Sequence, residues 1–243
     1  MKQLPLILFL CCCLSTSAQQ FIKSGTIEYE ARTNQYKTIE GNEWLERVKD
    51  QIPQFSVNYY QMDFNQNQSL FKYARSGDTK RSFNFFGKDD DKVWFNDYQS
   101  KQYTNIVSID DNYLISGTLK KIKWRLYPED QRIIAGFNCR RASTVLFDSV
   151  YVFAYYTEEI PVSGGPMGLN GLPGMILGVT VPRLFTSWVA TYVSLTDPKD
   201  IKAPAKGKKK TQQEIYQALT DLSKSWGKNG LKFLSPLIWR TFL

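Results

Sequence analysis

The side chains of this chain that could carry acid–base chemistry are carboxylates, because the sequence contains no histidine. That absence excludes Ser-His-Asp and Cys-His catalysis, zinc-protease motifs and histidine-ligated transition metals. The adjacent residues Glu158 and Glu159 would supply an acid and a base to a hydrolase. In a strand, however, neighbouring side chains point to opposite faces, so this pair would not converge on one substrate atom. We therefore expect both carboxylates to be solvated at a rim, and we predict no catalytic residue.

Two other acidic runs, Asp89–Asp91 and Asp110–Asp111, are typical of charged turns. They lack the alternating ligand pattern of a calcium loop, so we expect no metal site. Cys139 is the single cysteine beyond residue 18, which leaves no intramolecular disulfide and no dithiol redox pair. In its strand-like context we expect a small buried side chain in preference to a reactive thiol. Dinucleotide and phosphate-loop fingerprints are absent, and the sequence predicts no cofactor.

Residues 164–178 form the most unusual segment, with six of the chain's fifteen glycines and two of its ten prolines. So much glycine indicates backbone with positive φ, or a place where another segment or a ligand comes very close. The segment does not match a phosphate-binding loop, because Pro166 lacks a backbone donor and no helix follows. We interpret it as a shaped crossover that forms the rim of a binding sheet.

Tryptophan side chains supply the second part of a candidate ligand site. Indole rings stack on sugars and line lipid grooves, with packing in the core as the alternative role. Combined with the glycine-rich segment, they give a set of candidate ligand-binding residues. That set is Gly165, Pro166, Gly168, Gly171, Leu172, Pro173, Gly174, Trp94, Trp124 and Trp188.

The elements that must position these residues are mainly β-strands. Alternating apolar and polar residues bounded by turn residues predict short strands without intervening helices, which is typical of an antiparallel meander. We expect a mainly β fold with flanking helices: a large curved antiparallel sheet or half-open barrel, plus a C-terminal helical segment. An amphipathic helix is predicted over 42–52. The predicted strands are 25–31, 55–64, 68–75, 92–96, 102–109, 113–119, 123–126, 132–135, 138–147, 150–157, 175–181 and 184–195.

The start of the chain has the pattern of a secretory signal peptide. Residues 1–18 combine a basic start, an apolar run and small residues before the expected cleavage site. The predicted protein is therefore exported, to the periplasm or the periphery of the outer membrane. Residues 19–197 follow as the predicted antiparallel β-sheet domain.

The last part of the chain is strongly basic. Residues 198–243 carry ten basic against three acidic side chains, whereas 19–197 carry equal numbers. We predict a basic linker over 198–210 and, over 211–243, a helix with an apolar end. Such a segment would contact an anionic membrane surface or a partner protein, with a solvated linker as the alternative. Nucleic acid is not expected as a partner, because no basic motif is interleaved with aromatic residues.

Two segments resemble the signatures of a known family. Gly171–Ile176 is similar to the hexapeptide that names the GLPGLI family, an exported family abundant in Bacteroidota, with Met175 in place of the usual leucine. Residues 134–142 resemble a strand pattern of the same family, with Arg141 where lysine is usual. The resemblance covers about residues 25–195 and implies an exported, strand-rich protein with no settled activity, often encoded near outer-membrane transport genes. By analogy, the pattern is similar to carriers that enclose a lipid in a half-open β-barrel.

Three functions are consistent with the sequence. The first is a non-enzymatic envelope protein that binds a hydrophobic ligand, either an acyl chain or a peptide. The second is an interaction module that docks on an outer-membrane transport or assembly complex through residues 198–243. The third is a carboxylate-dependent hydrolase that uses Glu158 and Glu159.

Overall fold

The computed structural model describes residues 21–41, 46–47, 49–77, 91–147, 149–198, 200–227 and 230–243. The predicted signal peptide, residues 42–45 and 48 of the predicted helix 42–52, and the residues Asp89 and Asp90 lie outside this described part. Among the described residues, no helix is long and apolar enough to cross a membrane.

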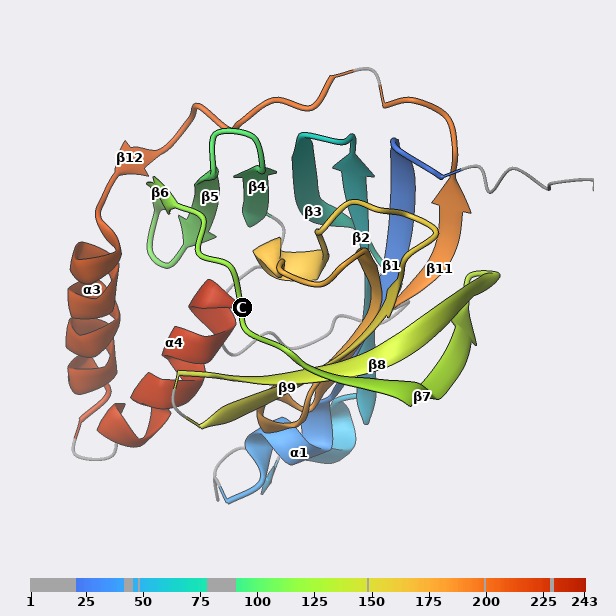
Figure 1. Ribbon diagram of the computed structural model, residues 1–243. Helices are drawn as coiled ribbons and strands as arrows, with labels where there is room; N and C mark the ends of the chain where they lie inside the picture. Colours follow the sequence, from blue (N-terminus) through green and yellow to red (C-terminus); the bar gives the residue numbers. More distant parts are fainter. Residues whose placement is uncertain are drawn as a thin grey trace, which may run out of the picture.

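A single open sheet of twelve strands dominates the described structure (Figure 1). All neighbouring strands pair antiparallel except β12 and β6, which pair in parallel. The strand order across the sheet is β12-β6-β5-β4-β3-β2-β1-β11-β10-β9-β8-β7. The strands are β1 (Gly25–Asn34), β2 (Phe55–Phe64), β3 (Gln68–Ser76), β4 (Val93–Asp97), β5 (Gln102–Ser108), β6 (Asn112–Thr118), β7 (Arg125–Ile134), β8 (Phe137–Leu146), β9 (Val150–Thr157), β10 (Met175–Val181), β11 (Thr186–Ser194) and β12 (Lys208–Lys209).

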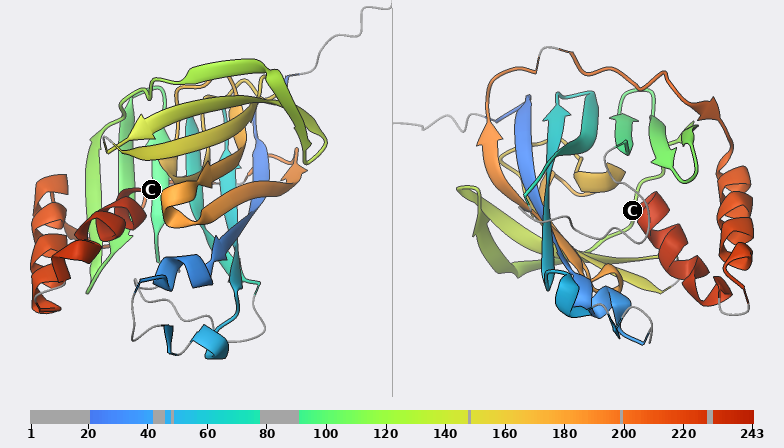
Figure 2. Two further views of the ribbon diagram at one scale, coloured as in Figure 1. Left: turned by 90° about the horizontal axis from the view of Figure 1, so that it is seen from below. Right: turned by 180° about the vertical axis from the view of Figure 1, so that it is seen from behind.

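The connection between β6 and β7 shows why the sheet is curved. These strands lie near opposite ends of the strand order, and eleven strands in a flat sheet would place them about 48 Å apart at ~4.8 Å per step. Residues 119–124 join them, and so short a connection reaches at most about 25 Å. The sheet therefore curls until its two ends approach each other (Figure 2). We call the region between β6 and β7 that residues 119–124 cross the seam.

The inner, concave face of the sheet carries the main hydrophobic core. On β1, Ile27, Tyr29 and Ala31 are buried, whereas the glutamates between them point outward, as period-two alternation requires. β10 is buried along nearly its whole length because the chain covers it on both faces. The Tyr29 hydroxyl donates a 2.7 Å hydrogen bond to the Ile176 carbonyl and so ties β1 to β10.

A helical layer covers the inner face of the sheet at β5 and β6. It consists of α3 (Gln212–Ser225), a 3₁₀ turn at Gly230–Phe233 and α4 (Leu234–Phe242), seen at the left of Figure 1. Ile215, Leu219 and Leu237 from these helices form a second core cluster with Val107, Tyr113 and Ile115 of the sheet. The remaining helical elements are short: α1 (Gln35–Ile39) and 3₁₀ turns at Lys49–Gln51, Pro166–Gly168 and Pro182–Leu184.

The predicted linker 198–210 ends in contact with the sheet. Its residues Lys208 and Lys209 form β12 against β6, and Lys208 makes an ion pair with Asp111. The Lys210 ammonium lies 4.5 Å from the centre of the Tyr113 ring, at cation–π distance. This part of the basic segment is therefore occupied by contacts within the chain.

The strand predictions agree closely with the structure. The bounds of β2, β9 and β10 coincide with those predicted, and the predicted curved antiparallel sheet with a C-terminal helical segment is confirmed. One strand prediction is wrong: in place of the two predicted strands 123–126 and 132–135, a single strand, β7, spans Arg125–Ile134. An irregularity between Tyr127 and Gln131 interrupts the β7–β8 register, which explains why the alternation breaks there.

Candidate functional site

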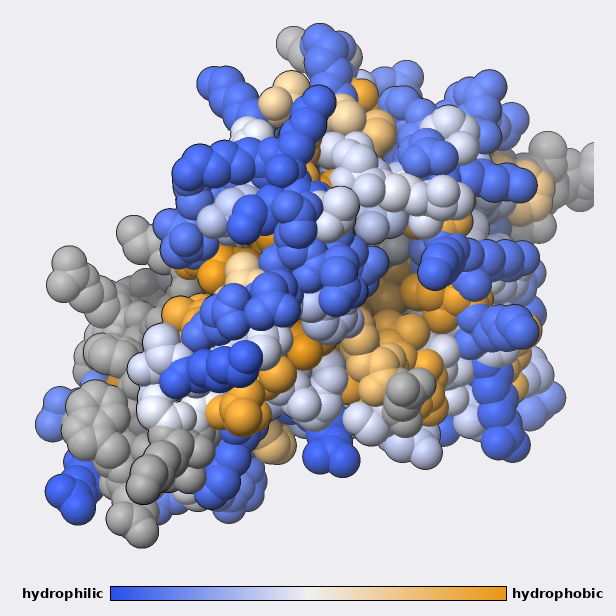
Figure 3. All heavy atoms as spheres, turned by 90° about the vertical axis from the view of Figure 1, so that its left-hand side faces the viewer, coloured by the Kyte–Doolittle hydropathy of each residue, from blue (hydrophilic) through white to orange (hydrophobic). Residues whose placement is uncertain are grey.

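A cavity with a mainly apolar lining lies at the seam. It is a groove of about 520 Å³, which we call the seam groove. Its walls come from the inner face of the sheet, residues 119–124 between β6 and β7 (from here on the crossover), the β8–β9 turn, the glycine-rich segment and the ends of the helical layer. On the side of the molecule that carries α3, hydrophobic side chains are visible in a hollow between hydrophilic ones (Figure 3). The lining residues are Asn96, Tyr103, Asn105, Ile115, Thr118, Leu119, Lys120, Ile122, Leu146, Phe147, Met167, Gly168, Leu169, Gln212, Phe242 and Leu243.

Two residues of the groove have left-handed backbone. Met167 has φ 56° and Phe147 has φ 49°, and both are among five non-glycine residues with positive φ in the described chain. This conformation is unfavourable for side chains with a β-carbon, and such strain concentrates at binding and active sites. The Met167 turn is held in place because the Asn96 side-chain amide donates a 3.1 Å hydrogen bond to the Gly168 carbonyl.

Two of the polar side chains that line the groove, Tyr103 and Asn105, come from β5. The side-chain oxygen Oδ1 of Asn105 is buried and has no hydrogen-bond partner. Burial raises the pKa of the Tyr103 hydroxyl above its ordinary value, so this group stays protonated and can donate a hydrogen bond. The groove can therefore offer an acceptor and a donor within mainly apolar walls.

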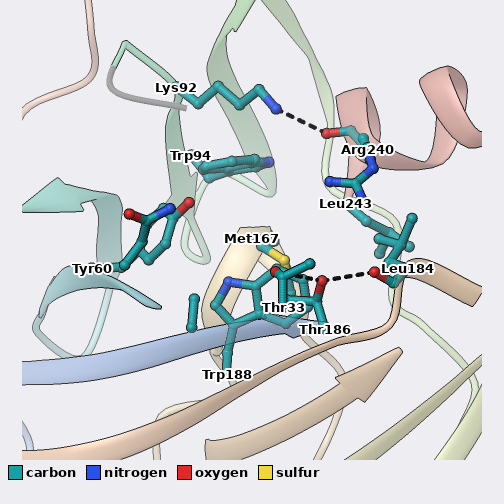
Figure 4. A pocket seen from close by; sticks show the side chains of 12 residues that line it. Thr33, Tyr60, Lys92, Trp94, Met167, Leu184, Thr186, Trp188, Arg240 and Leu243 are labelled. Atoms are coloured by element: carbon teal, nitrogen blue, oxygen red, sulfur yellow. Dashed lines mark hydrogen bonds between the residues drawn. The ribbon is translucent and has the colours of Figure 1, made fainter. Parts of the chain in front are cut away.

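A smaller cavity of about 50 Å³ lies next to the groove (Figure 4). The rings of Trp94 and Trp188 line it, and the buried Lys92 reaches across to donate a 3.1 Å hydrogen bond to the Arg240 carbonyl. Met167 and Leu243 line both this cavity and the seam groove. Met167, in the 3₁₀ turn, and Leu243 therefore lie between the two cavities.

The glycine-rich segment was predicted to form the rim of a binding sheet. It lies mostly in the interior of the curved sheet, and only residues 167–169 line the seam groove. Met167, Leu169 and Leu172 belong to the main core, and the 3₁₀ turn at Pro166–Gly168 lies at the centre of Figure 1. The glycines are needed because the segment packs against other backbone. A β-carbon at Gly171, where φ is +98°, would lie 2.5 Å from the Ile122 carbonyl oxygen, and one at Gly174 would collide with the Thr157 carbonyl.

The structure brings together only part of the predicted ligand-binding set. Gly168 lines the seam groove, and Trp94 and Trp188 line the small cavity. Trp124 is half-buried, and its indole N–H donates a 2.8 Å hydrogen bond to the Asn170 carbonyl, which fastens the crossover to the glycine-rich segment. Gly171 is partly exposed, whereas Gly165, Pro166, Leu172 and Gly174 are buried in the packing and Pro173 is exposed outside both hollows.

The expectation that Glu158 and Glu159 face opposite sides is wrong. β9 ends at Thr157, so the pair lies in a turn where strand alternation no longer applies, and both carboxylates line one polar pocket of about 420 Å³. Glu158 makes a 3.0 Å ion pair with Arg140, and the Glu159 carboxylate accepts a 3.2 Å hydrogen bond from the backbone N–H of Asn138.

Cys139 is free and fully buried, as predicted. Desolvation raises the pKa of its thiol to about 12, so the nucleophilic thiolate is disfavoured. Within the described ranges, no three acidic, cysteine or histidine side chains come together in a way that could hold a metal ion.

Several groove residues were missed at the sequence level. Alternation along β5 places Tyr103, Asn105 and Val107 on one face, and an asparagine on an apolar face is a signal that could have been noticed. Phe147 and Leu243 carry no such signal, because they reach the groove only through the curl of the sheet and the path of the last helix.

Comparisons with known proteins give a partial family match and a fold. A family model described as a protein of unknown function (Porph_ging) matches residues 140–178, a range that contains the hexapeptide Gly171–Ile176. No curated protein gives a significant match.

Two solved structures of PNGF-II, in different crystal forms, share the fold. One has a TM-score of 0.50 at 18% identity, the other 0.53 at 15%, and each match covers 80% of this chain and 32% of that chain. This chain therefore spans about a third of the length of PNGF-II. At such low identity the likeness shows a common fold and nothing more.

Proposed function

We propose that this protein is a non-enzymatic binding protein whose apolar ligand occupies the seam groove. The observation that carries the proposal is a groove of about 520 Å³ with mainly apolar walls and two strained residues, Met167 and Phe147, at its surface. Its volume falls in the range of about 300–1,000 Å³ typical of small-ligand sites, which are mostly apolar with a few placed polar groups.

The residues that form the walls of the groove also support binding of a separate molecule. The crossover 119–124 forms one wall, and its residues Leu119 and Ile122 are only partly buried. Leu169 of the glycine-rich segment and Phe242 of the helical layer also line the groove. An acyl chain or apolar side chains placed between these walls would be removed from water, which is favourable at roughly 25 cal/mol per Å².

We also propose that the protein acts after export and belongs with the GLPGLI proteins. The support is the signal-peptide pattern of residues 1–18 and the hexapeptide Gly171–Ile176, which lies inside the range matched by the family model. Fractionation of the native host cells, with detection of the N-terminus by mass spectrometry, tests export. Recovery of full-length protein in the cytosol would contradict it.

Blocking the groove tests the binding proposal. We expect the protein to bind dansyl-labelled undecanoate with a rise in dansyl fluorescence, and Leu119→Trp to weaken this binding at least about tenfold because the indole fills the groove. The matched control is Leu195→Trp, since Leu195 is 61% exposed and does not line the groove.

The control variant should bind like the wild type. Absence of binding to wild type, or equal binding by Leu119→Trp, would contradict the proposal. The double variant Glu158→Gln, Glu159→Gln should also bind normally, because this pair lines a different pocket. Loss of binding in that variant would contradict the seam groove as the binding site and would favour the hydrolase hypothesis.

A further inference from the structure

Two side chains of β5 face the seam groove with unused hydrogen-bonding capacity. Tyr103 and Asn105 are two residues apart in a strand, so they share the inner face, and both line the groove. Within the described part of the chain, neither side chain makes a hydrogen bond. Gly117, the β6 partner of Tyr103, leaves room for the phenol ring, since a β-carbon there would lie 2.9 Å from its hydroxyl.

Asn105 is an unusual residue for its place in the sheet. Its partners in register are Trp94 on β4 and Ile115 on β6, both buried. A buried carbonyl oxygen without a partner destabilises a fold, whereas an apolar side chain of similar shape would not. Such groups in native proteins need an explanation other than stability, and a ligand donor is the explanation that fits a groove.

The crossover also offers main-chain groups. Lys120 lines the groove, and its backbone N–H and C=O groups make no hydrogen bond to other described residues, whereas the Ile122 backbone packs against Gly171. Segments that bind extended peptides use main-chain donors and acceptors in this way, with apolar pockets for the alternate side chains.

We propose that the ligand of the seam groove is a short apolar peptide segment, recognised through its backbone amides. A peptide N–H donates to Asn105 Oδ1, the Tyr103 hydroxyl donates to a peptide carbonyl, and the Lys120 backbone offers a further donor and acceptor. An acyl chain has no group to satisfy Asn105, which is why the peptide is the better occupant. This inference rests on the proposed function and specifies its ligand.

Backbone-ester analogues give a direct test. The probe is a fluorescein-labelled, C-terminally amidated peptide of alternating leucine and valine between serines, followed by fluorescence polarisation. A series replaces each amide in turn by an ester, which removes one N–H and keeps the shape. For wild type, at least one ester should weaken binding about fivefold, as expected for the loss of one hydrogen bond.

Substitution at Asn105 should remove this preference. We expect Asn105→Leu to weaken peptide binding about tenfold and to abolish the amide-over-ester preference. The matched control is Thr104→Val, because Thr104 lies on the outer face of the same strand and bonds Ser116 there, 3.1 Å away. Tyr103→Phe removes only a hydroxyl and provides a second test if Asn105→Leu does not fold.

The outcomes separate this inference from the proposed function. If wild type binds dansyl-undecanoate and Leu119→Trp does not, but no peptide binds, the peptide inference fails and the binding proposal stands. If Asn105→Leu and Tyr103→Phe weaken both probes equally, the polar side chains act through structure and the inference is overturned. If neither probe binds wild type, both proposals fail.

Discussion

At the scale of the residue, Gly171 shows why the glycine-rich segment needs its composition. Its φ is +98°, and an added β-carbon would lie 2.5 Å from the Ile122 carbonyl oxygen, so both backbone conformation and space require glycine. Gly136 has a similar φ of +87° but nothing within 4 Å of the added atom. Substitution at Gly136 therefore tests the cost of positive φ alone, and substitution at Gly171 adds the cost of a steric clash with Ile122.

We expect Gly136→Ala to lower the free energy of unfolding by about 1 kcal/mol, and Gly171→Ala to lower it by about 2–4 kcal/mol, because only the second also displaces the crossover. Urea unfolding followed by tryptophan fluorescence measures both values. Equal losses at the two positions would show that the contact with Ile122 relaxes without cost.

Burial of the Cys139 thiol makes the stability of the fold depend on pH in the alkaline range. Burial raises the pKa of this thiol to about 12, whereas an unfolded cysteine has a pKa of about 8.5. The unfolded chain therefore releases the proton first, so this contribution to stability is intact below about pH 8.5 and decreases as pH rises further. Buried Tyr29, whose pKa desolvation also raises, acts in the same direction at higher pH.

Between pH 8 and pH 10 we expect the wild type to lose about 2 kcal/mol more stability than Cys139→Ala, measured by urea unfolding at each pH. A thiol reagent at pH 8 should react with the native protein far more slowly than with the unfolded chain. Equal pH dependence of the two proteins would show that the thiol is not desolvated.

At the scale of the element, the C-terminal helical layer is a separate cluster on the sheet. The Thr211 hydroxyl accepts from the Glu214 amide at 3.2 Å, and the Glu214 carboxylate accepts from the Thr211 amide at 2.7 Å. The two bonds form a capping box, for which a threonine three residues before a glutamate is the sequence pattern. Leu219, on the buried face of α3, is 1% exposed and packs in the smaller core cluster with Val107 and Ile115.

We expect Leu219→Ala to destabilise this layer by about 2–4 kcal/mol, because it leaves a cavity in a small cluster. Hydrogen exchange should accelerate in α3 and α4 and stay unchanged in β1 and β10. Leu231→Ala is the control, since that side chain is 54% exposed. Equal acceleration in the layer and the sheet would mean that they unfold as one unit.

Among the elements, those with regular alternation were predictable. β2, β9 and β10 have clear apolar patterns between turn residues, and their bounds follow from the sequence. β7 was not predictable as one strand, because its register is irregular between Tyr127 and Gln131. The effect of the turn after β9 was not predicted from the sequence either, and this turn places Glu158 and Glu159 in one pocket.

At the scale of the whole molecule, the short connection from β6 to β7 has the largest consequence. It forces the sheet to curl, and the curl creates the seam where the two ends of the sheet approach. The glycine-rich segment fills the interior of the curve, the helical layer covers β5 and β6, and the groove is the space left between them.

The sequence by itself determined the local features: the strands, the capping box, the buried cysteine and the exclusion of histidine chemistry. These depend on period, turn residues and composition, which are properties of neighbouring residues. Only the tertiary structure decided that Asn105, Phe147, Met167 and Leu243 line one groove and that the glycine-rich segment lies inside the sheet. These residues are far apart along the chain and meet because of sheet curvature, which no local pattern records.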